Sequence, residues 1–232
     1  STNKPKFIHL KYKSKKLSKS AKKIAIIGKG MTYDSGGLSL KPADYMLTMK
    51  MDMAGAGFVF GVFEALGQIQ PKNIEVHGLI PSVENMPGPN AYKPDDVVQG
   101  LSKKTIEIIN TDAEGRVILS DAIEYANRLK VDEMVDLATL TGACMVALGN
   151  YTAGLFSNNK RLTNKLLNAS KNVGEKLWQL PLDDELRQDI DSQIADIKNA
   201  ASTRYGGAIT AAMFLEFFVK DIPWSHIDIA GP

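Results

Sequence analysis

The seven-residue stretch Asn110–Arg116 places two carboxylates, a glycine and a guanidinium side by side. Asp112 and Glu114 are separated by one small residue, so on an extended turn both side chains can face the same way. Adjacent carboxylates repel each other unless they share a proton or a cation, and a divalent metal ion commonly resolves that repulsion. Gly115 lets the backbone turn, and Arg116 can hold an anion in a bidentate geometry. The pattern predicts metal-dependent chemistry. The alternative is an acidic helix N-terminus, where Asp and Glu only complement the helix dipole.

The elements on either side of this stretch must position it. Residues 105–109 alternate and are β-branched, which predicts a half-buried strand. Apolar residues from Val117 to Leu129 recur at helical spacing, which predicts a helix. The acidic turn therefore lies at the junction between a strand and a helix. In open α/β sheets, ligands bind at such junctions.

Further charged residues stand at or beside the ends of other predicted elements. Lys29 and Asp34 lie in a glycine-rich segment, residues 28–37, that follows an apolar strand at residues 24–27. This segment matches neither glycine pattern of the phosphate-binding loops, so we expect a flexible loop. Lys41 follows, and Asp52 precedes a small, apolar segment, Ala54–Ile69, that predicts a buried helix. Taken alone, Asp52 would be interpreted as a helix cap.

The remaining pattern predicts an α/β fold. We expect strands at residues 7–12, 74–80, 134–140 and 224–229, helices at residues 159–173 and 208–220, and an ordered loop at residues 86–94. Strands that alternate with helices indicate a mixed, mostly parallel sheet sandwiched between helices.

Composition narrows the class of protein. The chain has 232 residues, 44% hydrophobic and 23% charged, which is ordinary for a soluble globular protein. We find no apolar run near the roughly 20 residues of a membrane helix. The one cysteine, Cys144, excludes an internal disulfide and fits a cytoplasmic setting. Nine of the 28 Lys and Arg residues lie in residues 1–23, so the remainder carries 19 basic and 26 acidic residues, about −7. We expect a solvated hairpin turn at residues 13–23.

The charged residues, taken together, resemble a known family. The sequence is similar to the leucine (cytosol) aminopeptidases, a family of dinuclear zinc or manganese peptidases, and most similar to their cytoplasmic bacterial members. The matching segments are Gly28–Gly30, Tyr33–Gly37, Lys41, Asp52, Asn110–Arg116 and Asp136–Ala143. The similarity runs from about residue 5 to the last residue, and the heptapeptide with its upstream partners is highly specific.

The resemblance implies a role for each matched position. One metal would be held by Lys29, Asp34, Asp52 and Glu114, and the other by Asp34, Asp112 and Glu114. Lys41 would polarise the substrate carbonyl, and Arg116 would hold a bicarbonate ion that serves as general base. Met49, Thr139, Leu140 and Gly142 would line the substrate pocket.

The family also implies how the parent protein works. Its members use two divalent ions, zinc or manganese, remove amino-terminal residues such as leucine from peptides, and assemble as cytoplasmic homohexamers. They carry an additional amino-terminal domain and further carboxy-terminal residues. We therefore expect residues 1–232 to be a portion of the peptidase catalytic domain.

Two alternatives come from other functional classes. A metal-dependent phosphatase would use the same carboxylates, with Lys41 and Arg116 on phosphate. A nucleic-acid-binding protein would use the basic residues 1–23. For the three histidines, His9, His77 and His226, we expect hydrogen-bonded structural roles.

Overall fold

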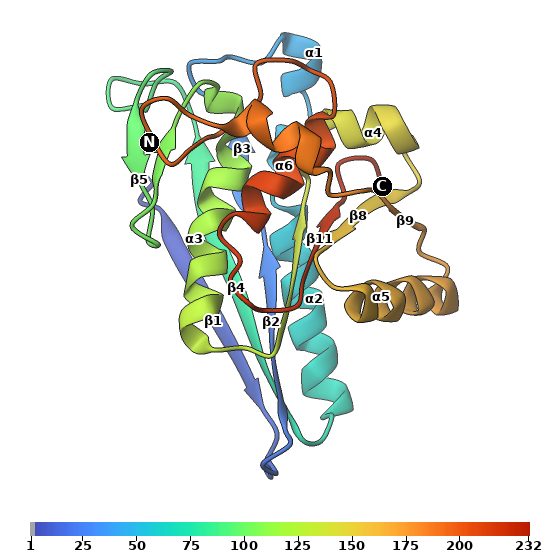
Figure 1. Cartoon of the computed structure of the whole chain (residues 1–232). Coiled ribbons are helices and arrows are strands. Elements are labelled where there is room, and N and C mark those ends of the chain that lie inside the picture. Colours follow the sequence, from blue (N-terminus) through green and yellow to red (C-terminus); the bar gives the residue numbers. More distant parts are fainter. Residues whose placement is uncertain (1–2) are drawn as a thin grey trace.

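The computed structural model describes residues 3–232, which form one large and one small β-sheet with surrounding helices (Figure 1). The strands are β1 (Lys6–Lys13), β2 (Lys22–Gly28), β3 (Gly30–Asp34), β4 (Ile74–Asn85), β5 (Val97–Gln99), β6 (Thr105–Glu107), β7 (Glu133–Ala138), β8 (Ala153–Ser157), β9 (Leu177–Gln179), β10 (Ile197–Lys198) and β11 (Trp224–Asp228). The α-helices are α1 (Ala43–Met46), α2 (Ala54–Ile69), α3 (Glu114–Leu129), α4 (Gly142–Leu148), α5 (Lys160–Val173) and α6 (Gly207–Glu216). Three 3-10 helices are η1 (Met49–Met51), η2 (Thr111–Ala113) and η3 (Asp184–Ile190).

The large sheet is mixed and mostly parallel, which confirms the prediction. Its strand order is β1-β4-β2-β7-β11-β8-β9, and β3 pairs with β4. The central strands β4, β2, β7 and β11 run parallel to one another, whereas β1 pairs antiparallel with β4 and β8 pairs antiparallel with β11. Because the central strands share one direction, their carboxyl ends meet at one edge of the sheet, where ligands bind in open α/β sheets.

Helices cover both faces of this sheet because side chains alternate along each strand. In β2, Ala25 and Ile27 belong to the main core, which includes residues of α3 and α6. Ile26, between them, packs on the opposite face with residues of α2. α5 covers the same face further along, where Leu166 and Leu167 pack on β7, β8 and β11. Figure 1 shows α3 and α6 crossing in front of the sheet.

The strand before the acidic motif lies outside the large sheet, which corrects the prediction that this motif ends a strand of the open sheet. β6 pairs antiparallel with β5 and parallel with β10 in a separate three-stranded sheet. The backbone N–H groups of Ile109 and Asn110 both donate to Oδ1 of Asn199, at 2.9 and 3.2 Å. This buried asparagine therefore anchors the chain just before the motif.

Two connections also differ from the predictions. Residues 30–34 of the expected glycine-rich loop form β3. Only the turn after Asp34 is a glycine-dependent loop, as predicted, because Gly36 and Gly37 have positive φ values of 83° and 65°. Residues 13–23 do not join a hairpin, since β4 lies between β1 and β2. They are instead a crossover between two strands that do not pair.

Helix α2 is less buried than predicted. Its buried residues are Gly55, Ala56 and Val59. Phe58 and Phe60 are 47% and 46% exposed, so apolar side chains extend over the solvent-facing side as well. Packing on the sheet uses one face only, and the apolar composition of α2 exceeds what that face requires.

One segment has the length and composition of a membrane-spanning helix, contrary to the prediction from sequence. Within Ala43–Ile69, a stretch of 18 residues has a mean hydropathy of 1.2, and 22% of that stretch is buried. Core helices of soluble proteins meet the same criterion. The segment is not one continuous helix, because Leu47 has extended backbone angles and Thr48 a φ of 76°. α2 itself has 16 residues and packs on the sheet.

Close approach of α2 to the sheet requires glycine at position 55. A Cβ atom there would lie 2.2 Å from the carbonyl oxygen of Leu137 and 2.9 Å from the backbone nitrogen of Lys29. We expect Gly55→Ala to lower the free energy of unfolding by about 1–3 kcal/mol or more, because rigid backbone must move. Urea denaturation measures this change.

Gly61→Ala in the same helix is the control, since no atom lies within 4 Å of the added Cβ. It should be neutral or stabilising by about 0.5–1 kcal/mol. Equal effects of the two substitutions would contradict this packing argument.

Candidate metal centre

The site lies at the carboxyl ends of the parallel strands. Lys29 follows β2, Asp34 ends β3, Asn85 ends β4, Thr139 follows β7 and Asp228 ends β11. Residues that are far apart in the sequence therefore meet at one edge of the sheet. The acidic motif reaches the same edge from the other side, through η2 and the first turn of α3.

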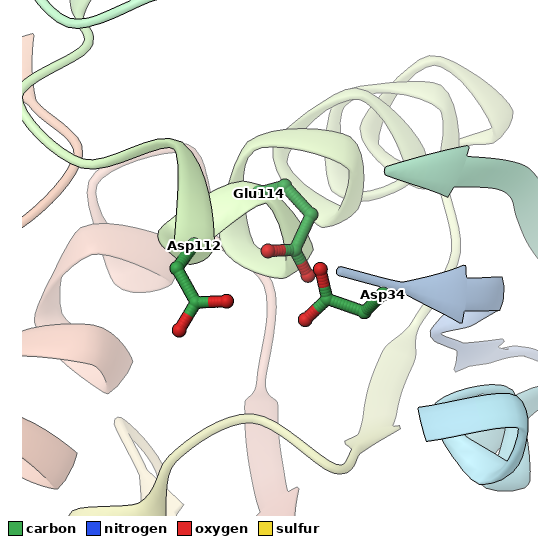
Figure 2. A group of neighbouring side chains, drawn as sticks. All are labelled: Asp34, Asp112 and Glu114. Carbon is green, nitrogen blue, oxygen red and sulfur yellow. The ribbon is translucent and has the colours of Figure 1, made fainter. Parts of the chain in front are cut away.

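Three carboxylates form a cluster there. One ligand oxygen each of Asp34, Asp112 and Glu114 lies within 4.8 Å of the others. Figure 2 shows the three carboxyl groups turned toward one another from β3, η2 and α3. Asp34 and Glu114 are buried, and the Asp112 side chain is 32% exposed. Oxygen donors from separate elements that converge in this way are typical of a divalent cation site.

Two lysine ammonium groups lie between these carboxylates. Lys29 Nζ is 2.9 Å from Asp52 Oδ2 and 3.1 Å from Glu114 Oε1. Lys41 Nζ is 3.0 Å from Asp34 Oδ2 and 2.6 Å from Asp112 Oδ1. Each ammonium group thus supplies positive charge between two carboxylates. The carboxylate donors and their negative charge fit a divalent cation.

Asp52 belongs to the site and does not cap α2. It lies between η1 and α2, and neither helix has a side-chain cap. Its carboxylate accepts a hydrogen bond of 2.7 Å from the Thr139 hydroxyl, and only 4% of the residue is exposed. The same threonine accepts a 3.0 Å hydrogen bond from Lys29 Nζ at its carbonyl oxygen. Asp52, Thr139 and Lys29 therefore form one buried unit.

The electrostatics follow from burial of many charges together. Burial and the neighbouring charges of Asp34 and Asp52 together raise the pKa of Glu114 to about 7, against the opposing charge of Lys29. Burial by itself would lower the pKa of Lys29, but the charges of Glu114 and Asp52 outweigh it and raise that pKa. Lys41 behaves in the same way beside Asp112 and Asp34, so its pKa is also raised. Without a metal ion, both lysines are protonated.

Arg116 is buried and forms no ion pair with the residues that the structure describes. The residue is 8% exposed, and its Nε has no hydrogen-bond acceptor among residues 3–232. Burial lowers the pKa of its guanidinium to about 10, although Glu114 and Asp228 oppose that shift. A buried guanidinium with a free donor is suited to binding a small anion.

Sequence reasoning missed several residues that organise the site. Asn85 Nδ2 lies 2.9 Å from Asp34 Oδ1, 2.9 Å from the Thr111 carbonyl oxygen and 3.4 Å from Glu114 Oε2. It therefore orients two of the three clustered carboxylates. Its strand was predicted to end at residue 80, so no local signal pointed to it. Asp228, fully buried, accepts hydrogen bonds from the backbone N–H groups of Leu140 and Thr141.

Of the four predicted pocket residues, Thr139 and Met49 lie beside Asp52. Thr139 contacts Asp52, and the backbone N–H of Asp52 donates to the carbonyl oxygen of Met49 at 3.3 Å. Leu140 packs on the main core, and Gly142 is exposed with open space where a Cβ would be. A cavity of about 740 Å³ borders the carboxylate cluster and is lined by Asn85, Tyr92 and Glu114 among others, but by none of the four predicted pocket residues.

Gly115 has a different role from the predicted one. It lies within α3 with no positive φ, so its backbone is not what requires glycine. A Cβ at this position would lie 2.6 Å from Lys29 Cε and 2.7 Å from Lys29 Nζ. Glycine here makes room for the lysine.

We therefore expect Gly115→Ala to displace Lys29 and to weaken metal binding by roughly 10- to 100-fold, as loss of a supporting contact does. Titration calorimetry with Zn²⁺ or Mn²⁺ measures this change. Gly67→Ala, with nothing within 4 Å of its added Cβ, is the control and should bind metal normally. Unchanged affinity in Gly115→Ala would show that Lys29 can shift without loss.

Comparison with known proteins gives a consistent result. The pattern of the cytosol aminopeptidase family, catalytic domain, matches residues 1–232. A relative from Persephonella marina, described as "Probable cytosol aminopeptidase", is 56% identical over 233 residues. The aligned region includes 100% of this chain and 46% of that relative. A relative from Aquifex aeolicus with the same description is 57% identical over 230 residues, 98% of this chain and 46% of that protein. This chain thus spans about half the length of the curated relatives it matches. On this match, and with the acidic cluster at the expected edge of the sheet, the chain belongs to the catalytic domain of the cytosol aminopeptidase family.

Proposed function

We propose that the chain carries the active site of a metalloaminopeptidase, which removes the amino-terminal residue, preferably leucine or a similar residue, from peptides. One observation carries the proposal. Asp34, Asp112 and Glu114 converge within 4.8 Å, and the buried Lys29 and the partly buried Lys41 neutralise them and Asp52. Few folds gather so many opposite charges at the carboxyl edge of a sheet without a cation or a substrate to use them.

Two divalent ions would be held by the residues that now form the two lysine-centred groups. Lys29, Asp34, Asp52 and Glu114 would hold one ion, and Asp34, Asp112 and Glu114 the other. The prevalence of oxygen donors suits manganese, and the general affinity order favours zinc. When bound, such a pair polarises a carbonyl group and supplies an activated water. Lys29 would bind as the neutral amine, so a cation must displace its proton.

Lys41 and Arg116 would act on the reacting groups. Lys41 is held protonated beside Asp34 and Asp112, and its side chain is 15% exposed, so it can donate a hydrogen bond to the carbonyl oxygen of a bound peptide. That bond strengthens as negative charge develops on the oxygen. Arg116 offers its buried, unpaired Nε to bicarbonate, which would accept a proton from the attacking water.

Leucine preference would come from the loop after β7 and from η1. Leu140 offers an apolar surface, and Gly142 leaves space beside it. Met49 adds a flexible apolar side chain that adapts to irregular shapes. The carbonyl oxygen and hydroxyl of Thr139 are held by Lys29 and Asp52, so this wall of the pocket is tied to the metal site.

The setting of the whole protein is likewise a proposal. We infer that residues 1–232 are a portion of the catalytic domain of a longer, cytoplasmic enzyme that assembles as a homohexamer, as the family resemblance implies. The exposed phenylalanines of α2, Phe58 and Phe60, support an assembly in which apolar surface is covered. Sedimentation analysis of the longer protein tests the oligomeric state.

The experiment that tests the activity combines metal analysis with an assay. Metal content is measured by elemental analysis, and hydrolysis of a leucyl chromogenic amide is followed before chelation, after chelation and after addition of Mn²⁺. We expect two equivalents of metal and a chelator-sensitive cleavage. The Aquifex aeolicus relative, about twice as long, is the matched control, because it separates a missing segment from a wrong assignment.

Four outcomes decide the question. Metal binding and cleavage by both proteins support the proposal. Cleavage by the relative alone would mean that part of the active unit lies in the segments of the relative that this chain does not cover. Stoichiometric metal with hydrolysis of phosphate esters, and not of amides, would replace the peptidase by a phosphatase. Absence of metal from both proteins would remove the site altogether.

A further inference from the structure

One side chain, that of Asn85 at the end of β4, contacts all three elements that carry the carboxylate cluster. Its Nδ2 donates to Asp34 Oδ1 in β3 and to the carbonyl oxygen of Thr111 in η2, both at 2.9 Å, and lies 3.4 Å from Glu114 Oε2 in α3. An amide nitrogen has two N–H donors, so Asp34 and Thr111 each take one and Glu114 interacts at the longer distance. All three neighbours are acceptors, so the amide nitrogen must face them. Asn85 is 5% exposed, and it therefore acts from within the protein.

The amide and the lysines contact different oxygens of the same carboxylates. On Asp34, Asn85 holds Oδ1 while Lys41 Nζ lies 3.0 Å from Oδ2. On Glu114, Asn85 contacts Oε2 while Lys29 Nζ lies 3.1 Å from Oε1. Figure 2 shows these two carboxyl groups turned toward each other. A donor on one oxygen limits rotation of the carboxylate, so the other oxygen stays directed at the position of the cation.

The backbone of Asn85 holds the same region of β3. Its carbonyl oxygen accepts hydrogen bonds from the N–H of Ser35, at 2.9 Å, and from the Ser35 hydroxyl, at 2.7 Å. Asp34 lies opposite Asn85 in the pairing of β3 with β4. The N–H of Gly36 also donates to Asp34 Oδ1, at 2.9 Å. The sheet therefore fixes the position of Asn85, and a supporting residue on a rigid element places its neighbours more precisely than one on a loop.

The carbonyl group of Thr111 is the second point that Asn85 holds. This oxygen also accepts a hydrogen bond of 2.8 Å from the hydroxyl of Tyr92. Thr111 is fully buried, and its own hydroxyl donates to the carbonyl oxygen of Gly36 at 2.6 Å. The next residue is Asp112. The start of η2 is thus fixed by two donors on one carbonyl group, and the direction of the Asp112 side chain follows from it.

We propose that Asn85 is a positioning residue of the metal centre. It holds Asp34 and Glu114, the two residues that both proposed ligand sets share, and through Thr111 it sets the turn that carries Asp112. This inference rests on the proposed function. Carboxylates this close repel each other, so without the amide donor they would turn apart. Loss of Asn85 should therefore weaken the binding of both ions. Loss of such a supporting residue costs roughly 10- to 100-fold in metal affinity.

The variant Asn85→Leu tests the role, because leucine is close to asparagine in shape but has no donor. Titration calorimetry of the metal-free chain with Mn²⁺ should show roughly 10- to 100-fold weaker binding at both equivalents. Tyr92→Phe should give a smaller decrease, because it removes one of the two hydrogen bonds to the Thr111 carbonyl oxygen and leaves Asp34 held. Circular dichroism checks that each variant is folded.

Asn127→Leu is the matched control. Asn127 is also a buried asparagine, but it lies near the other end of α3, where its Nδ2 donates to Glu124 and to the carbonyl oxygen of Phe218. Its replacement removes comparable hydrogen bonds and should lower stability without changing Mn²⁺ affinity. Equal losses of affinity in Asn85→Leu and Asn127→Leu would assign the effect to general destabilisation and overturn the proposal.

Hydrogen exchange of the metal-free chain separates this proposal from the proposed function. Backbone amides of residues 110–116 should exchange roughly 10-fold faster in Asn85→Leu than in wild type, the equivalent of one lost hydrogen bond, and should be unchanged in Asn127→Leu. Unchanged exchange in Asn85→Leu, or unchanged Mn²⁺ affinity, would contradict the positioning role. A wild-type chain that binds no Mn²⁺ would refute the proposed function instead, and faster exchange in Asn85→Leu would still show that Asn85 holds the acidic motif.

Discussion

Asp52→Ala should bind less metal than the wild type and should lose peptide hydrolysis below detection. Asp52 is 4% exposed, and its carboxylate holds both Lys29 Nζ, at 2.9 Å, and the Thr139 hydroxyl, at 2.7 Å. Without it, Lys29 keeps Glu114 and the Thr139 carbonyl oxygen as partners, with one carboxylate instead of two in a buried environment. A metal ion in that position loses one carboxylate ligand and the threonine loses its anchor. Elemental analysis and the leucyl amide assay measure the two effects.

The structural cost of this substitution must be separated from its effect on the site. Breaking a buried ion pair by removal of one partner costs about 3–5 kcal/mol, so Asp52→Ala will also be less stable. Asp52→Asn keeps the shape and the threonine hydrogen bond but removes the charge, and it should lose metal with a smaller loss of stability. Asp44→Ala, at an exposed residue of α1, is the matched control and should retain both metal and activity. Full metal content in Asp52→Asn would refute the proposed ligand role.

Lys41→Ala should have the opposite pattern, with metal retained and turnover reduced by roughly 100- to 1000-fold, the usual cost of removing an oxyanion donor. Lys41 Nζ is not a proposed ligand. It lies 2.6 Å from Asp112 and 3.0 Å from Asp34, where it competes with a cation for the same oxygens. Its removal should therefore leave metal affinity unchanged or increase it. Calorimetry and steady-state kinetics measure the two quantities.

The variant Lys41→Arg is the control for charge. It keeps a cation at the same position, but the larger planar group cannot place one donor as the ammonium does. We expect it to restore part of the rate. Loss of metal in Lys41→Ala would instead mean that this lysine holds the carboxylates in place, and full activity would remove it from the catalytic scheme.

Local patterns predicted the elements well because each depends on near neighbours in the chain. The strand of residues 24–27, the helix of residues 54–69 and the last strand, residues 224–229, all appear close to their predicted bounds. These segments have apolar periodicities and turn residues that act over a few positions. The alternation of strands and helices was sufficient to predict the mixed, mostly parallel sheet with helices on both faces.

Such local patterns did not predict which strands pair with each other. β4 inserts between β1 and β2, and β6 joins a separate small sheet, because pairing is decided by contacts between residues far apart in sequence. The degree of burial of α2 likewise depends on how many elements pack around it. Its apolar composition suggested a fully buried helix, whereas the sheet covers only one face.

For the candidate site, the sequence by itself determined the chemical types: five potential metal ligands, Lys41 and Arg116, predicted through the resemblance to the aminopeptidase family that the acidic heptapeptide and its upstream partners carry. Only the tertiary structure decided which of these groups touch. It paired Lys29 with Asp52 and Glu114, and Lys41 with Asp34 and Asp112. It also added Asn85, and it assigned Gly115 to making room for Lys29. The physical reason is that charges act through space, and the parallel strands bring their carboxyl ends to one edge whatever their separation along the chain.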